Sequence, residues 1–225
     1  MPNAPLQRLN EGWLQPFERP ALQWLASRTP LWMTPDRLTW LGFGGAIICL
    51  VGYAWAAWNP VGLWLASAGL VVNWFGDSLD GNVARYRKIE RPRYGYFLDN
   101  AIDVAQQFIV TVGVGLSGFI RWDLCFLGFS VFLMMSVLTL LRTSVSGIYQ
   151  LSYGGIGPTE MRVVGMAMNA LLFFVPPERL DGLGLPMTYP NILSLSWSIG
   201  CLGTFSLSLI LQIRQLAIED PPRQP

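Results

Sequence analysis

The chain has 225 residues, of which 52% are hydrophobic and only 13% are charged. Soluble domains carry about 25% charged residues, so this composition argues for a membrane protein and against both a soluble globular and a disordered chain. The formal net charge of +1 excludes an electrostatic nucleic-acid binder, which needs a strongly basic face. The chain contains no His, which excludes a His general base, a His-containing catalytic triad and a His metal ligand.

The N-terminal part, up to residue 30, is expected to lie in the cytoplasmic interface of the membrane. Residues 6–30 place Trp13 and Trp24 among polar residues, and the segment is too polar to span a bilayer. Pro16 and Pro20 are expected to interrupt its helical structure. The sequence therefore predicts an amphipathic segment that precedes the first span.

Apolar runs without charges then recur along the chain, and a membrane-spanning helix needs about 20 such residues. The shorter runs must include polar residues at one end. The six expected spans cover residues 38–58, 61–76, 104–120, 124–141, 163–177 and 191–213. The sequence thus predicts an all-α membrane protein with six transmembrane helices preceded by an N-terminal amphipathic interfacial helix. The expected organisation is an interface segment (1–30), a six-helix catalytic domain (31–216) and a disordered tail (217–225).

The distribution of basic residues orients these spans, because cytoplasmic loops carry an excess of Lys and Arg. With both termini in the cytoplasm, only Arg121 and Arg179 of the 15 basic residues fall in outer loops. The chain is short and shows no targeting segment. A multi-pass protein of the bacterial inner membrane is therefore expected.

Four aspartates carry the most informative pattern. Asp77 and Asp80 end the second expected span, and Asp99 and Asp103 begin the third, so both pairs lie at the cytoplasmic membrane level. Spacings of three and four residues place each pair on one helix face. If these two faces meet, four carboxylates converge on one small volume.

Positive charge must offset the free-energy cost of such a cluster. An aspartate at the centre of a span costs about 2.5–3.5 kcal/mol on the insertion scale, and less near the interface. Two hard divalent cations would balance the four negative charges. Two-metal sites stabilise the attacking and leaving oxygens in phosphoryl transfer. The alternative is that the carboxylates pair with the basic residues of segment 85–93.

Gly81 follows Asp80 within the helix, where glycine costs about 1 kcal/mol relative to alanine. A ligand that approaches the backbone would explain Gly81 and the small Ala84 on the same face. Packing against another helix explains them equally well.

These residues resemble the signature of the CDP-alcohol phosphotransferases. The matching pattern is Asp77-x-x-Asp80-Gly81-x-x-Ala84-Arg85, then Gly95-x-x-x-Asp99-x-x-x-Asp103. Upstream, Pro35-Asp36-x-x-Thr39 resembles the Pro-Asn-x-x-Thr entry of that family, with Asp36 in place of Asn. One departure is the nine residues between Arg85 and Gly95, where the family has eight. This segment, 86–94, is expected to be a polar loop in which Pro92 ends any helix.

The resemblance implies an integral membrane phosphotransferase of phospholipid biosynthesis. An alcohol attacks the phosphorus of a CDP-linked phosphatidyl or phospho-alcohol group, and CMP leaves. The implied cofactors are two divalent cations, Mg²⁺ or Mn²⁺, and a homodimer is implied as well. Asp103 is implied as the general base, in contact with metal. The implied metal ligands are Asp77, Asp80, Asp99 and Asp103, and the implied nucleotide contacts are Gly81, Ala84, Arg85 and Gly95.

The acceptor side is less defined by the sequence. Arg142 and Arg162 could bind a phosphorylated acceptor or could anchor the helices under the positive-inside rule. Glu160 could line the acceptor pocket or favour the first turn of its helix. Gln106 and Gln107, inside the third span, are expected to face the bundle interior and to contact an alcohol group or a neighbouring helix.

Three alternatives stay open. Within the family, the donor could be CDP-diacylglycerol with a polar acceptor, or CDP-choline or CDP-ethanolamine with a diacylglycerol acceptor. Outside it, a divalent-cation channel or transporter could also use membrane carboxylates. A non-catalytic membrane scaffold with the same fold is the third alternative.

Overall fold

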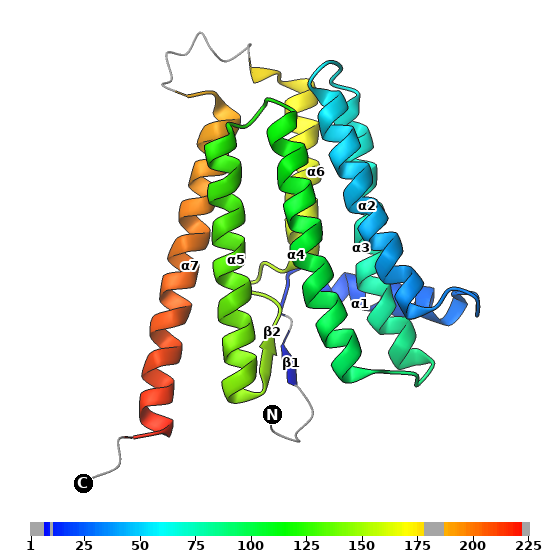
Figure 1. Cartoon of the computed structure of the whole chain (residues 1–225), viewed down its shortest axis with the longest axis vertical. Helices are drawn as coiled ribbons and strands as arrows, with labels where there is room; N and C mark the ends of the chain where they lie inside the picture. Colours follow the sequence, from blue (N-terminus) through cyan, green and yellow to red (C-terminus); the bar gives the residue numbers. More distant parts are fainter. Residues whose placement is uncertain (1–6, 10, 178–186, 222–225) are drawn as a thin grey trace.

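A computed structural model of the chain describes residues 7–9, 11–177 and 187–221. In this part of the chain, helices α2 to α7 stand side by side in a bundle, and α1 crosses one end of it (Figure 1). The helices are α1 (Gln15–Arg28), α2 (Pro35–Ala56), α3 (Gly62–Tyr86), α4 (Pro92–Leu116), α5 (Trp122–Ser146), α6 (Pro158–Phe174) and α7 (Tyr189–Glu219). Two short strands, β1 (Gln7–Leu9) and β2 (Ile148–Gln150), pair in parallel.

Each of the six expected spans falls on one of the bundle helices, but the helices are longer at the end that carries α1. Helix α3 continues ten residues past the expected end of its span, from residue 76 to Tyr86, and α4 begins at Pro92. All four aspartates therefore lie inside regular helices. The expectation that Pro92 ends a helix is wrong, because this proline occupies the first turn of α4, where its missing N–H costs nothing.

The apolar character of the bundle is that of a membrane protein. Among the described residues, α2, α5 and α7 are long and apolar enough to cross a membrane. Little of α7 is buried inside the structure, so most of this apolar helix faces outward. Crossing by the more polar α3 and α4 and the shorter α6 stays a prediction.

Helix α1 is one uninterrupted helix, and the predicted interruption at Pro16 and Pro20 is wrong. Pro16 lies in the first turn, where prolines are tolerated, and Pro20 removes a single intrahelical hydrogen bond. The helix stays in place because Leu22 and Ala26 are buried in a core cluster with residues of α2 and α3. On its other side, α1 exposes Phe17.

Helices α2 and α3 pack backbone against backbone through glycines. A Cβ added at Gly45 would lie 2.4 Å from the backbone N of Asn73, and one added at Gly76 would lie 2.3 Å from the backbone N of Gly42. Side chains at these positions would force the helices apart. The glycines therefore fix how α2 lies against the part of α3 that carries the aspartates.

The N-terminal segment runs along the connection between α5 and α6, which the sequence did not predict. Beyond the β1–β2 pairing, the backbone N–H of Trp13 donates to the carbonyl of Gly155 at 3.1 Å. The backbone N–H of Glu11 donates to Ser152 Oγ at 2.7 Å. The β1–β2 pair lies at the α1 end of the bundle, between α5 and α4 in the view of Figure 1. At the C-terminus, α7 continues to Glu219 and so includes the first residues of the predicted tail, whereas residues 222–225 lie outside the described residues.

Candidate active site at the carboxylate cluster

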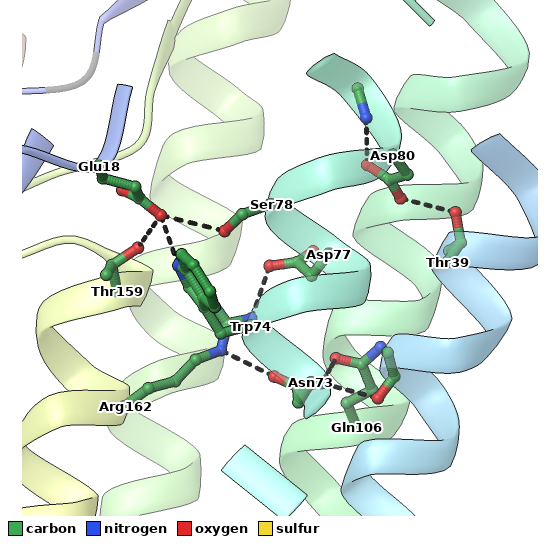
Figure 2. Close-up of polar contacts among 12 residues, drawn as sticks. Glu18, Thr39, Asn73, Trp74, Asp77, Ser78, Asp80, Gln106, Thr159 and Arg162 are labelled. Atoms are coloured by element: carbon green, nitrogen blue, oxygen red, sulfur yellow. Dashed lines mark hydrogen bonds and ion pairs between the residues drawn. The ribbon is translucent and has the colours of Figure 1, made fainter. Parts of the chain in front are cut away.

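Asp80 lies on α3 and is almost fully buried, with 6% of its surface exposed. Thr39 of α2 donates its hydroxyl to Asp80 Oδ2 at 2.6 Å, and the backbone N–H of Gly81 donates to Oδ1 (Figure 2). The glycine packing of α2 on α3 brings Thr39 to this position. Thr39 is the Thr of the Pro35-Asp36-x-x-Thr39 segment, so the structure links that segment directly to Asp80.

Asp77 lies one turn earlier on α3 and forms an ion pair with Arg162 of α6, with 2.5 Å between Oδ2 and Nη2. Arg162 also donates from Nε to Asn73 Oδ1 at 2.7 Å. Asn73 in turn donates from Nδ2 to Gln106 Oε1 of α4 at 2.7 Å and to the Gly42 carbonyl of α2 at 2.9 Å. One hydrogen-bonded network thus joins α2, α3, α4 and α6 beside the cluster (Figure 2). The expected inward orientation of Gln106 is confirmed, and its contact is a neighbouring helix.

The third nitrogen of the Arg162 guanidinium, Nη1, has no hydrogen-bond partner among the described residues. Nη1 is buried and donates to no acceptor in the described part of the chain. A buried donor without an acceptor costs about 1–3 kcal/mol, and more when the group is charged. This nitrogen is therefore suited to an acceptor atom from outside the chain.

Asp99 and Asp103 lie one turn apart on α4, which packs against α2. Asp103 interacts electrostatically with Asp77, Asp99 and Asp80 and with Arg162. The two aspartate pairs, far apart in the sequence, therefore belong to one electrostatic unit.

The carboxylates are less tightly gathered than expected. Among the described residues, no three acidic or thiol side chains lie close enough together to hold a metal ion. The physical reason is that like charges repel, and each carboxylate on α3 has a protein partner. Asp77 pairs with Arg162, and Asp80 accepts from Thr39 and Gly81.

The chemistry of the donor set nevertheless fits hard divalent cations. Carboxylate oxygens are the ligands that Mg²⁺ and Mn²⁺ prefer, and two of these aspartates, Asp77 and Asp103, interact with the guanidinium of Arg162. The net negative charge of the cluster leaves room for added positive charge. The residues that would hold two such ions are Asp77, Asp80, Asp99 and Asp103.

The residues assigned to the nucleotide lie next to this cluster. A Cβ added at Gly81 would lie 3.3 Å from Nη1 of Arg85, so the Arg85 guanidinium is folded over the glycine one turn before it. Around Gly95, near the start of α4, no atom lies within 4 Å of such a Cβ. Ala84 lies between Gly81 and Arg85 on α3 and is half-buried. The Arg85 guanidinium therefore lies over Gly81, and the space around Gly95 is open.

The structure separates the three candidate acceptor residues. Arg162 joins the cluster. Glu160 is buried, and both of its carboxylate oxygens accept hydrogen bonds from backbone N–H groups. Oε2 accepts from Gly157 at 2.9 Å, and Oε1 accepts from Leu14 at 2.8 Å. It therefore caps α6 and holds the N-terminal segment. Arg142 donates to the side chain of Gln150 on β2.

Sequence reasoning missed Glu18 of α1. Its Oε1 accepts from Trp74 Nε1 at 2.6 Å, from Thr159 Oγ1 at 2.8 Å and from Ser78 Oγ at 3.2 Å (Figure 2). No local pattern in the sequence indicates this junction, because its three donors come from α3 and α6. Asn73 was also missed, although its spacing of four residues from Asp77 could have identified it as a residue of the same helix face.

The chain is similar to several known proteins. The chain is 37% identical over 123 residues to an archaetidylinositol phosphate synthase of Pyrococcus horikoshii, covering 54% of this chain and 60% of the relative. It is 36% identical over 85 residues to a phosphatidylinositol phosphate synthase of Cutibacterium acnes, covering 37% of this chain and 38% of the relative. It is 30% identical over 161 residues to cholinephosphotransferase 1 of Danio rerio, covering 67% of this chain and 41% of the relative. The matches thus span less than two thirds of each relative.

A family match covers most of the chain. Residues 32–211 match the CDP-alcohol phosphatidyltransferases, and this range contains the bundle helices almost completely, together with all four aspartates and Arg162. The resemblance in the aspartate signature is therefore confirmed over the whole bundle, and the chain belongs to the CDP-alcohol phosphatidyltransferase family.

Proposed function

We propose that the protein is an integral membrane transferase of phospholipid biosynthesis. It transfers a phosphatidyl or phospho-alcohol group from a CDP-linked donor to an alcohol hydroxyl and releases CMP. The observation that carries this proposal is the electrostatic unit of Asp77, Asp80, Asp99 and Asp103 on α3 and α4, inside the range that matches the family.

The reaction divides the carboxylates by role. Asp103 is the general base that accepts the proton of the attacking hydroxyl. Asp77, Asp80 and Asp99, with Asp103, hold two divalent cations, Mg²⁺ or Mn²⁺. When bound, these ions supply positive charge that offsets the diphosphate and makes CMP a better leaving group. Thr39 keeps the Asp80 carboxylate in place through its hydroxyl.

The nucleotide side uses α3 beyond Asp80 and the start of α4. The Arg85 guanidinium over Gly81 offers a cation to the diphosphate, and the missing side chains at Gly81 and Gly95 let the cytidine diphosphate approach the backbone. Ala84 contributes by its small size. The donor thus reaches the carboxylate cluster from the end of the bundle that carries α1 and the α3–α4 connection.

The acceptor side centres on Arg162. Its buried Nη1 has no partner among the described residues, and a guanidinium is well suited to a phosphate oxygen. A phosphorylated polar acceptor with CDP-diacylglycerol as donor is therefore the reaction that we favour. Two of the relatives are named as inositol phosphate lipid synthases. CDP-choline or CDP-ethanolamine with a diacylglycerol acceptor is the alternative, and one relative is named as a cholinephosphotransferase.

The proposal includes the setting of the enzyme. We place the six bundle helices across the bacterial inner membrane, α1 in the cytoplasmic interface and the carboxylate cluster on the cytoplasmic side. Exposed Trp13 and Trp24 in and next to α1 support this placement, since Trp is enriched at membrane interfaces. The family resemblance adds a homodimer as a further expectation.

CMP release by the detergent-purified protein tests the reaction and its branch. CDP-diacylglycerol, CDP-choline and CDP-ethanolamine are supplied separately with pooled phosphorylated alcohols or with diacylglycerol, each with Mn²⁺, Mg²⁺ or EDTA. We expect cation-dependent release with CDP-diacylglycerol and a phosphorylated alcohol. Release only from CDP-choline or CDP-ethanolamine would select the alternative, and no release from any donor would contradict the proposal.

A further inference from the structure

Arg162 neutralises a carboxylate that the proposed function assigns to a cation. Its Nη2 lies 2.5 Å from Asp77 Oδ2, and the side chains of the two residues are only 12% and 25% exposed. Pairs at the surface contribute little, but removing one partner of a buried pair leaves a charge that is costly to keep there. The pair is therefore more than an incidental surface contact.

The position of Arg162 is fixed by neutral neighbours. Nε is held by Asn73, and Asn73 is itself held by Gln106 and the Gly42 carbonyl. The guanidinium is thus built into the junction of four helices, with one amino group on Asp77 and the other, Nη1, without a partner among the described residues. Such a group can let go of Asp77 without losing its anchor at Asn73.

We propose that Arg162 is the resting counter-ion of Asp77 and that a divalent cation displaces it when the site is loaded. This inference rests on the proposed function, because it needs cations to bind at the aspartates. Once displaced, the guanidinium keeps its Nε contact with Asn73 and presents both amino groups to an anionic substrate. Loading of the cation site and assembly of an anion site are then coupled through one residue.

Equilibrium binding of Mn²⁺, measured by electron paramagnetic resonance on the detergent-purified full chain without nucleotide, tests this inference. Arg162→Gln removes the competing cation and is expected to bind Mn²⁺ roughly tenfold more tightly than the wild type. Arg162→Lys keeps the charge but cannot contact Asn73 and Asp77 together, so we expect a gain of about threefold. Arg121→Gln, which removes the same charge at the opposite end of the bundle, is the control and should bind as the wild type does.

The outcomes separate this inference from the proposed function. Unchanged or weaker Mn²⁺ binding by Arg162→Gln would overturn the displacement while leaving the enzyme assignment intact. Tighter binding by Arg162→Gln together with wild-type affinity in Arg162→Lys would also overturn it, because long-range charge alone would then explain the gain. No Mn²⁺ binding by the wild type would instead remove the metal requirement of the proposed function. A thermal unfolding measurement on each variant confirms that the compared proteins are folded.

Discussion

At the scale of single residues, the charged side chains of the site are held in place by neutral ones. Thr39 supports Asp80, and Asn73 supports Arg162. A buried carboxylate keeps its charge at a tolerable cost only while hydrogen-bond donors replace the water that it has lost. The neutral partners are therefore as important for the site as the aspartates themselves.

Replacement of Thr39 tests this support. Thr39→Val keeps the shape of the side chain but removes the hydroxyl that donates to Asp80, so the free energy of unfolding should fall by about 1–3 kcal/mol. Thr39→Ser keeps the hydroxyl and is the matched control. Thermal unfolding in detergent, with and without Mn²⁺, measures both variants. Equal stability of Thr39→Val and the wild type would contradict a supporting role for this hydrogen bond.

At the scale of helices, the α2–α3 pair is the scaffold of the site. Its glycines let the two backbones touch, and this contact sets Thr39 of α2 opposite Asp80 of α3. Helix α1 then covers α3 from the side, where Glu18 joins it to Trp74 and to Thr159 of α6. The packing of α2 on α3 and the contacts of α1 with α3 and α6 thus hold the site in place.

Two neighbouring glycines of α2 provide a matched test of the scaffold. Gly45→Ala would place a Cβ 2.4 Å from the backbone N of Asn73, whereas a Cβ at Gly44 meets no atom within 4 Å. Overpacking of this kind costs about 1–3 kcal/mol, while alanine at an open helix position is favourable by up to about 1 kcal/mol. Gly45→Ala should therefore lower the melting temperature and Gly44→Ala should not. Similar behaviour of the two variants would exclude close backbone packing at Gly45.

The Glu18 junction can be tested separately. Glu18→Ala removes the acceptor shared by Trp74, Ser78 and Thr159, so α1 should detach more readily and trypsin should cut faster after Arg28. Glu11→Ala removes a carboxylate from the exposed part of the same segment and serves as the control. If Glu18→Ala is cut at the wild-type rate, Glu18 does not hold α1 on the bundle.

At the scale of the whole molecule, the two ends of the bundle differ. The connections between α2 and α3 and between α4 and α5 lie at one end, and α1, the α3–α4 connection and the β1–β2 pair lie at the other (Figure 1). The four aspartates lie toward the second end. This division agrees with the orientation that the basic residues predict.

Site-directed labelling tests that orientation. Single cysteines are introduced by Glu90→Cys and Arg121→Cys after Cys49, Cys125 and Cys201 have been replaced by alanine. A membrane-impermeant maleimide added to intact spheroplasts should label Arg121→Cys and should label Glu90→Cys only after permeabilisation. The reverse pattern would place the carboxylate cluster on the outer side and would refute the proposed topology.

Much of this organisation could be predicted from the sequence, because it depends on local patterns. Apolar runs located the bundle helices, and spacings of three and four residues placed the aspartates on common faces. The pairing of Asp77 with Arg162 could not be predicted in this way, since the two residues are 85 positions apart. The parallel β1–β2 contact and the Glu18 junction escaped for the same reason: each depends on how distant segments meet in the folded chain.

The central claim is that the carboxylate cluster performs cation-dependent transfer from a CDP-linked donor, with Asp103 as the base. The most direct measurement compares CMP release by the wild type and by Asp103→Asn, with Mn²⁺ binding followed on the same samples. We predict cation-dependent release by the wild type, a loss of about 100-fold or more in the variant, and partial retention of Mn²⁺ binding through the other three aspartates. Wild-type turnover in Asp103→Asn would contradict the account.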